Sequence, residues 1–170
     1  QLFSVADNSI WVHGRDEEGH PAFAVYKKGK WEAIPSSRFA RHEMLRLRPD
    51  AKQGLWALTK NIQDNQIHLF YIQSQSVDEL PLNENIQSLA NSSNFYDLTI
   101  DANRNAWFYG RDLLTVFKSE DNEARQWDYI PGINGRTVYS VHTRGDEEWI
   151  SMRGDGLEFS GVAELKEIRI

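Results

Sequence analysis

The chain has 170 residues, of which 40% are hydrophobic and 26% charged; these values are typical of one soluble globular domain and too apolar for a disordered chain. Its formal net charge of −6 disfavours binding to nucleic acid. The sequence has no cysteine, which excludes disulfides and thiolate chemistry, and no apolar run approaches the roughly 20 residues of a membrane span, so no membrane insertion is expected.

Tryptophans mark an internal repeat in the chain. Trp11, Trp56, Trp107 and Trp149 stand 45, 51 and 42 residues apart, and each follows a polar stretch and an apolar alternating run. Two shorter motifs recur in the same register: Trp-x-x-Gly-Arg-Asp at 11–16 and 107–112, and Trp-x-x-Ile-Pro at 31–35 and 127–131. This spacing indicates four repeats, at about 1–43, 44–91, 92–135 and 136–170.

Each repeat is predicted to hold four short strands, because apolar runs are separated by the turn-forming residues Gly, Asn, Asp and Pro. The strands expected in the first repeat are 2–6, 10–13, 22–26 and 31–34, with a hairpin turn at 28–30. Those expected in the third repeat are 95–100, 106–109, 114–118 and 126–130. A helical turn is suggested at 41–47 and at 84–90, where repeats connect.

Four-stranded units of 40–50 residues with a tryptophan on the second strand match propeller blades better than a sandwich or a barrel. We therefore predict an all-β fold, a β-propeller-like array of four four-stranded blades forming a single propeller-type domain over residues 1–170. One blade cannot bury both of its faces, so neighbouring blades must stack on it. The repeated tryptophans are expected to fill the gaps between blades.

The order of these motifs resembles the two-component regulator propeller repeats of bacterial sensor proteins. The fourth repeat carries the resemblance through Val138–Val141, Glu148-Trp149-Ile150 and Gly156–Phe159. In the first repeat it rests on 2–5, 10–12 and 29–31. The Trp-x-x-Ile-Pro ending is also similar to tectonin-type propeller repeats of lectins and lipid-associated proteins. Both resemblances imply propeller blades, and the motifs that carry them describe how blades pack.

The Gly-Arg-Asp segments are the best functional lead in the sequence. In a propeller, the loop after the second strand lies on the face where the blades connect, and that face commonly carries the ligand site. The predicted ligand-binding residues are therefore Arg15, Asp16, Arg111, Asp112, Arg153 and Asp155. The structural interpretation, which is favoured here, is that glycine sets the turn and arginine pairs with an aspartate of a neighbouring blade.

Other candidate sites have simpler explanations. Asp101–Asn105 resembles the start of a calcium loop, but Ala106 stands where that loop requires glycine, so an ordinary polar turn is favoured. The five histidines lack metal-ligand spacing, and no nucleophile or phosphate-binding motif occurs. Core or inter-blade packing accounts for most of the aromatic residues that suggest sugar stacking: Tyr109, Trp127, Tyr129 and Tyr139. We expect no cofactor, no metal and no enzyme activity.

Taken alone, the sequence favours a non-catalytic recognition or sensing module that binds a small ligand, a glycan or a partner protein through inter-blade loops. The alternative is a structural or scaffold propeller segment that assembles with further blades or another subunit. Whether four blades close within one chain, and hence whether the protein is a monomer or a dimer, is left open. The cellular location is also open, with an exported or periplasmic location slightly favoured.

Overall fold

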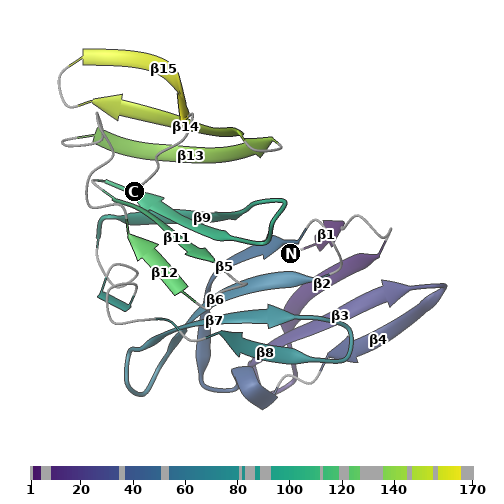
Figure 1. Ribbon diagram of the computed structural model, residues 1–170. Coiled ribbons are helices and arrows are strands. Elements are labelled where there is room, and N and C mark those ends of the chain that lie inside the picture. The colour runs from purple at the N-terminus through teal and green to yellow at the C-terminus, as the bar shows by residue number, and fades with distance from the viewer. Residues whose placement is uncertain are drawn as a thin grey trace. The chain divides into compact units, whose positions relative to one another are not determined.

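The computed structural model describes residues 2–4, 9–34, 37–50, 54–80, 82, 87–88, 93–111, 113–118, 123–126, 136–144, 147–154 and 157–165. It divides into two units, Gln1–Leu82 and Asn83–Ile170, each containing two antiparallel sheets (Figure 1). Strands make up most of the described residues, which confirms the all-β class, and none of the four sheets closes on itself within these residues. The propeller arrangement and the single domain over 1–170 stay predictions.

The first sheet of the first unit has the strand order β1-β2-β3-β4. In β3, Phe23 and Val25 are buried while the alternate residues Ala24 and Tyr26 are partly exposed, because successive side chains of a strand point to opposite faces. A two-residue turn joins β3 to β4, with φ of 51° at Lys28 and 80° at Gly29, as tight hairpins require. The strands are β1 (Leu2–Ser4), β2 (Ile10–Arg15), β3 (Pro21–Lys27) and β4 (Lys30–Ile34).

The second sheet has the order β5-β6-β7-β8 and follows a short 3-10 helix, η1 (Ser37–Phe39). Of residues 41–47, where the sequence suggested a helical turn, 42–47 form instead the start of β5 and Arg41 lies in the turn before it. The reason is pairing with β6, from His42 opposite Asn61 to Pro49 opposite Leu55, which overrides local propensity. The strands are β5 (His42–Pro49), β6 (Leu55–Asn61), β7 (Ile67–Ile72) and β8 (Val77–Leu80).

The second unit contains a four-stranded sheet of order β12-β11-β10-β9 and a three-stranded sheet of order β13-β14-β15. Within the helical turn predicted at 84–90, residues 87–88 are helical, and the others lie outside the described residues. The strand expected at 126–130 is found at 123–126, and 127–130 is likewise outside them. The strands are β9 (Phe95–Ile100), β10 (Ala106–Gly110), β11 (Leu113–Lys118), β12 (Glu123–Gln126), β13 (Arg136–Arg144), β14 (Glu147–Gly154) and β15 (Leu157–Leu165).

A series of ring contacts joins the two sheets of the first unit. Phe39 of η1 is fully buried, with its ring centroid 5.2 Å from that of Phe23 on β3 and 5.1 Å from that of Phe70 on β7. His13 extends the series beyond Phe23, at 4.9 Å, and His42 extends it beyond Phe70, at 5.4 Å. Tilted and edge-on contacts of this kind add to the stabilisation that burial provides. The short helix thus serves as the wedge on which both sheets pack.

Two of the repeated tryptophans, one in each unit, are anchored in the same way. The indole Nε1 of Trp11 donates to Ser9 Oγ at 3.0 Å, and that of Trp107 donates to Asp101 Oδ2 at 2.9 Å. Each acceptor precedes the strand that carries its tryptophan, β2 or β10. Trp11 and Trp107 are buried, so the ring adds apolar contacts to the core while its N–H keeps a partner.

Truncating these anchored tryptophans should destabilise the fold strongly. We expect Trp11→Ala and Trp107→Ala each to lower the free energy of unfolding by about 3–5 kcal/mol, because each leaves a large cavity in a core. Trp31 is 58% exposed, so Trp31→Ala is the matched control and should cost less than about 1 kcal/mol. Urea unfolding of the three variants measures the losses. A loss below about 1 kcal/mol at both buried sites would contradict the packing described.

Acid should weaken the fold through two histidines of the ring series. Burial lowers the pKa of His13, and so does the charge of Arg15. Burial lowers the pKa of His42, His68 lowers it further, and Glu79 and Asp64 oppose that shift. The folded chain therefore binds protons at these sites more weakly than the unfolded chain, whose histidines titrate near about 6.5. Their contribution to stability is complete above that pH and is lost as the pH falls through the lowered values.

We therefore expect the free energy of unfolding to fall between about pH 7 and pH 5, before most carboxylates titrate. Urea titrations at intervals of half a pH unit measure this slope. The double variant His13→Gln, His42→Gln should be less stable at neutral pH but should show a shallower slope. An unchanged slope in that variant would assign the acid sensitivity to other groups.

Candidate ligand-binding cleft

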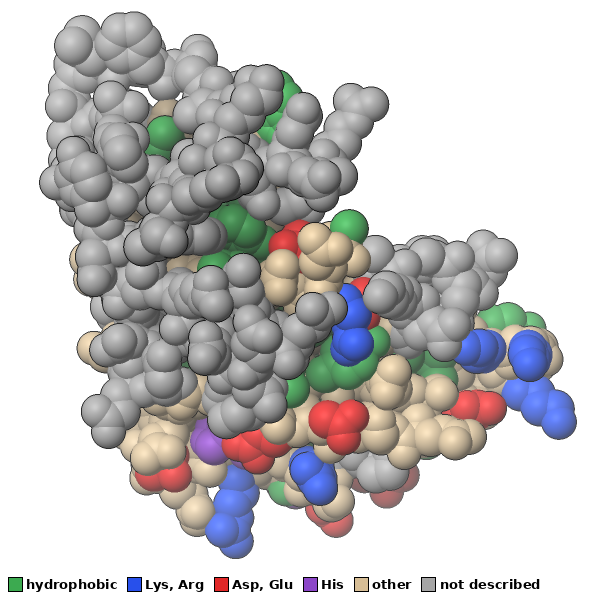
Figure 2. All heavy atoms as spheres, in the orientation of Figure 1, with side chains coloured by type: hydrophobic (Ala, Val, Ile, Leu, Met, Phe, Trp, Pro, Cys, Tyr) green, Lys and Arg blue, Asp and Glu red, His purple; other side chains and the backbone are tan. Residues whose placement is uncertain are grey.

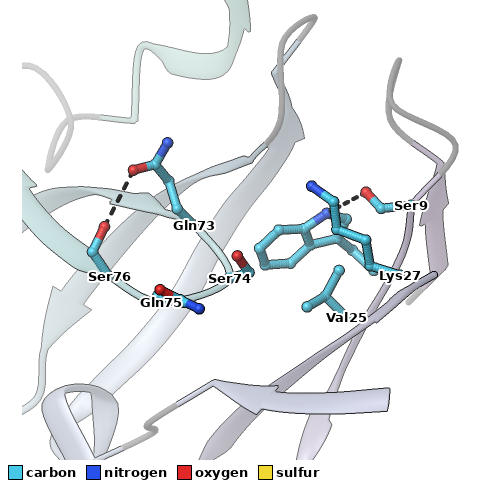
Figure 3. Close-up of a pocket in the computed structure, with 8 residues that line it drawn as sticks. Ser9, Val25, Lys27, Gln73, Ser74, Gln75 and Ser76 are labelled. Carbon is cyan, nitrogen blue, oxygen red and sulfur yellow. Dashed lines mark hydrogen bonds between the residues drawn. The ribbon is translucent and has the colours of Figure 1, made fainter. Parts of the chain in front are cut away.

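A cleft lies between the two sheets of the first unit, at the end where β3 finishes and β7 turns into β8 (Figure 3). Its volume is about 220 Å³, below the roughly 300–1,000 Å³ of pockets for drug-sized ligands. It therefore suits a compact molecule. The lining residues come from both sheets: Ser9, Trp11, Val25, Lys27, Gln73, Ser74, Gln75 and Ser76.

One wall of the cleft is the turn between β7 and β8. The backbone N–H of Gln73 donates to the carbonyl of Ser76 at 2.8 Å, which closes the turn. The Ser76 hydroxyl lies 3.2 Å from Gln73 Oε1 and 3.0 Å from Asp78 Oδ2, so its proton has two acceptors inside the turn. These bonds hold the loop in shape and leave Ser74 and Gln75 between the tied residues, on the side of the cleft (Figure 3).

The opposite wall belongs to the first sheet. Trp11 on β2 and Val25 on β3 are directly opposite each other in the strand pairing, and both are buried. The hydrogen bond from the indole to Ser9 holds the ring, which lines the cleft. Since Trp11 is only 1% exposed, its ring forms a firm wall and offers little area for stacking a sugar. Lys27 completes this wall at the end of β3.

The chemistry of the cleft suits binding. Its eight lining residues supply hydroxyls, side-chain amides, one ammonium group and two apolar side chains. None of these eight residues is a carboxylate or an imidazole, and the carboxylate of Asp78, which is outside the lining, accepts from the Ser76 hydroxyl at 3.0 Å. Neutral hydrogen-bonding groups around a small, partly apolar hollow are typical of sites that recognise a compact polar molecule.

The predicted site residues of the first unit lie elsewhere. Arg15 ends β2, opposite Pro21, whereas the cleft adjoins the other end of the same strands, where Ile10 is opposite Tyr26. The guanidinium of Arg15 donates to the carbonyl of Gly19. Asp16 Oδ1 accepts from the backbone N–H of Glu18 at 3.0 Å and of His20 at 2.8 Å. Both side chains therefore form these bonds within the β2–β3 turn, whereas the structural interpretation of the motif expected arginine to pair with an aspartate of a neighbouring blade.

In the second unit, two of the predicted arginines share a neighbour. Arg111 forms an isolated bridge with Thr137, and Arg153 on β14 pairs with the same threonine. Asp112 and Asp155 lie outside the described residues. The structure therefore brings Arg111 and Arg153 to either side of one strand, and places Arg15 and Asp16 in the other unit. That all six residues surround one opening stays a prediction.

Two groups of side chains bring together atoms that could bind a cation. Asp16, Glu18 and His20 have ligand atoms within 4.8 Å of one another, but they are solvent-accessible and Asp16 already caps its turn. Asp101 accepts from the backbone of Asn105 at 2.7 Å, from its side chain at 2.8 Å and from the Trp107 indole. That carboxylate is thus occupied within a polar turn, the reading favoured from the sequence.

The aromatic candidates for sugar stacking separate by exposure. Tyr109 is buried in the core of the second unit, together with Trp107, Val138 and Ile150. Tyr139 is 50% exposed, and Trp127 and Tyr129 lie outside the described residues.

On the face seen in Figure 2, acidic and basic side chains of the first unit are interspersed. The described part of the chain contains no helix long and apolar enough to cross a membrane.

Comparisons with known proteins give likenesses to solved structures. No protein-family model matches the chain, and no curated protein matches it. The chain is similar to the crystal structure of the extracellular domain of a one-component system from B. thetaiotaomicron, at 11% sequence identity and a TM-score of 0.47. The likeness covers 90% of this chain and 27% of that one, so the chain spans about a quarter of its length.

Proposed function

We propose that this protein is a non-catalytic recognition or sensing module whose first unit binds a small polar ligand in the cleft between its two sheets. The cleft carries the proposal, because hydrogen bonds within the β7–β8 turn and between Trp11 and Ser9 hold the residues that line it. A site whose walls are held in this way loses little conformational entropy when it binds, which favours affinity for a small molecule.

In this proposal, the sheets are propeller-type blades, as the repeated motifs suggest, and the ligand binds between the first two of them. The resemblance of the repeats to those of bacterial sensor proteins supports a sensing role and an exported or periplasmic location, where such a ligand would be met. The competing function is a scaffold segment that assembles with further blades or another subunit, and a scaffold needs no ligand in the cleft.

A thermal-shift screen of the full chain against neutral sugars, small carboxylates and divalent metals tests the proposal. A ligand that binds only the folded state stabilises it by about 2.7 kcal/mol at 100 times its Kd. For a chain of this size we expect a rise in Tm of roughly 5–10 °C. A screen in which no compound raises the Tm would favour the scaffold.

A matched pair of variants locates the binding. Ser74→Tyr places a large side chain in the cleft and should abolish the ligand-induced rise in Tm. Ser37→Tyr makes the same change at an exposed residue of η1, beside β5 at the opposite end of the two sheets, and should retain it. Equal responses from the two variants would place the ligand outside the cleft.

A further inference from the structure

The first sheet has a second face, which is apolar and open to solvent. Trp11, Phe23 and Val25 point inward and are buried against the second sheet, and the residues that alternate with them point to the opposite side. On β2, β3 and β4 each of these outward residues is exposed or partly exposed, and none is charged. They form the outer face of the sheet: Ile10, Val12, Gly14, Ala22, Ala24, Tyr26, Trp31 and Ala33.

This outer face has the character of an interaction surface. Trp31 is 58% exposed, and its ring centroid lies 5.2 Å from that of Tyr26, so two aromatic rings lie together on the surface. Ala24 and Ala33 are directly opposite each other in the middle of the face, which makes it flat there. Contiguous exposed apolar groups mark surfaces that another protein covers, and a flat sheet face suits a second sheet.

Side-chain size changes along the outer face. Ile10, Tyr26 and Trp31 lie side by side at one end of the strands, whereas Gly14 is opposite Ala22 at the other end. Two copies of this face fit each other when their strands run antiparallel, because the bulky end of each copy then covers the small end of the other. Large residues facing small ones let two layers interdigitate, and a two-fold axis makes the same contact twice.

The turns at the two ends of the face carry opposite charges. Residues 15–20, next to the small end, contain three carboxylates and one arginine, for a formal charge of −2 with histidine neutral. Residues 27–30, next to the bulky end, contain three lysines, for a charge of +3, and Figure 2 shows basic side chains gathered over this hairpin. An antiparallel pair of copies brings each basic turn beside an acidic one, whereas a parallel pair would bring like charges together.

We infer that the outer face of the first sheet binds a second copy of this chain, in a two-fold dimer whose facing strands run antiparallel. The face measures roughly 15 by 20 Å, from strand spacing and rise. With the turns at both ends, two copies bury on the order of 1,000 Å², the lower limit of specific interfaces, so the dimer is weak, with a Kd on the order of 10 μM. The cleft is on the inner side of the same sheet, so this inference goes beyond the proposed function.

Sedimentation velocity of the full chain tests the inference. Over a range from about 1 to 300 μM, we expect the chain to change from mostly monomer to mostly dimer. A chain that stays monomeric throughout, or that forms assemblies larger than a dimer, would overturn the inference.

A matched pair of variants on β4 assigns the dimer to the outer face. Ala33→Gln places a long polar side chain on that face and should raise the Kd at least about tenfold. Glu32→Gln introduces the same residue at the neighbouring exposed position, on the opposite side of the strand, and should change the Kd by less than about threefold. Equal effects of the two changes would place the contact elsewhere and overturn the inference.

Charge reversal tests the antiparallel orientation. The variant Lys28→Glu, Lys30→Glu makes both turns acidic, and the variant Glu17→Lys, Glu18→Lys makes both turns basic; the four residues are exposed. At low salt each variant alone should dimerise at least about tenfold more weakly, because like charges then meet at both ends. An equimolar mixture should regain the dimer as a pair of unlike chains. Failure of the mixture to associate would overturn the inference.

The failure of this inference is separable from the failure of the proposed function. A monomeric chain whose Tm rises with a ligand keeps the proposed function and loses the dimer. A dimer that no compound in the thermal-shift screen stabilises keeps the dimer and favours the scaffold. Ala33→Gln should leave any ligand-induced rise in Tm unchanged, since Ala33 is outside the lining of the cleft.

Discussion

A sheet with one apolar face must cover that face, and in the first unit two sheets cover each other. The wedge between them is Phe39, which the short helix η1 places between Phe23 and Phe70. The rest of the unit depends on this contact. It sets the spacing between the sheets, and Trp11 and Val25 belong to the same buried cluster. At the far ends of the strands the lining residues are mostly polar, and there the two sheets leave a cleft between them. The cleft lies where apolar packing stops and Lys27 and the β7–β8 turn begin.

Much of the fold followed from local pattern. Alternation of apolar and small residues over 22–26 predicted β3. The turn residues on either side gave its length to within two residues of the observed one. The burial of Trp11 and Trp107 followed from their position on the second strand of their repeats. The start of β5 was missed because residues 41–47 mix charged and apolar side chains without clear alternation, and pairing with β6, distant in sequence, decides their conformation.

The cleft could not be predicted in the same way. Its two walls come from residues 9–27 and 73–76, which carry no shared motif and meet only because two sheets pack together. The Gly-Arg-Asp motif attracted attention because it repeats, yet in the first unit its side chains bond within their own turn, which is a sufficient reason for its presence. The sequence feature nearest to the cleft is the run Lys27-Lys28-Gly29-Lys30. This run is typical of a hairpin turn and does not by itself indicate a cleft.

The anchoring of Trp11 has a practical consequence. The emission of an indole depends on the polarity around it and on the partner of its N–H, and here that ring forms the side of the cleft while Ser9, its hydrogen-bond acceptor, lines the same hollow. A molecule that displaces water from the cleft, or draws the serine hydroxyl toward itself, alters the surroundings of this ring directly. The protein therefore carries an intrinsic optical reporter at the position where occupancy matters, and it needs no attached dye.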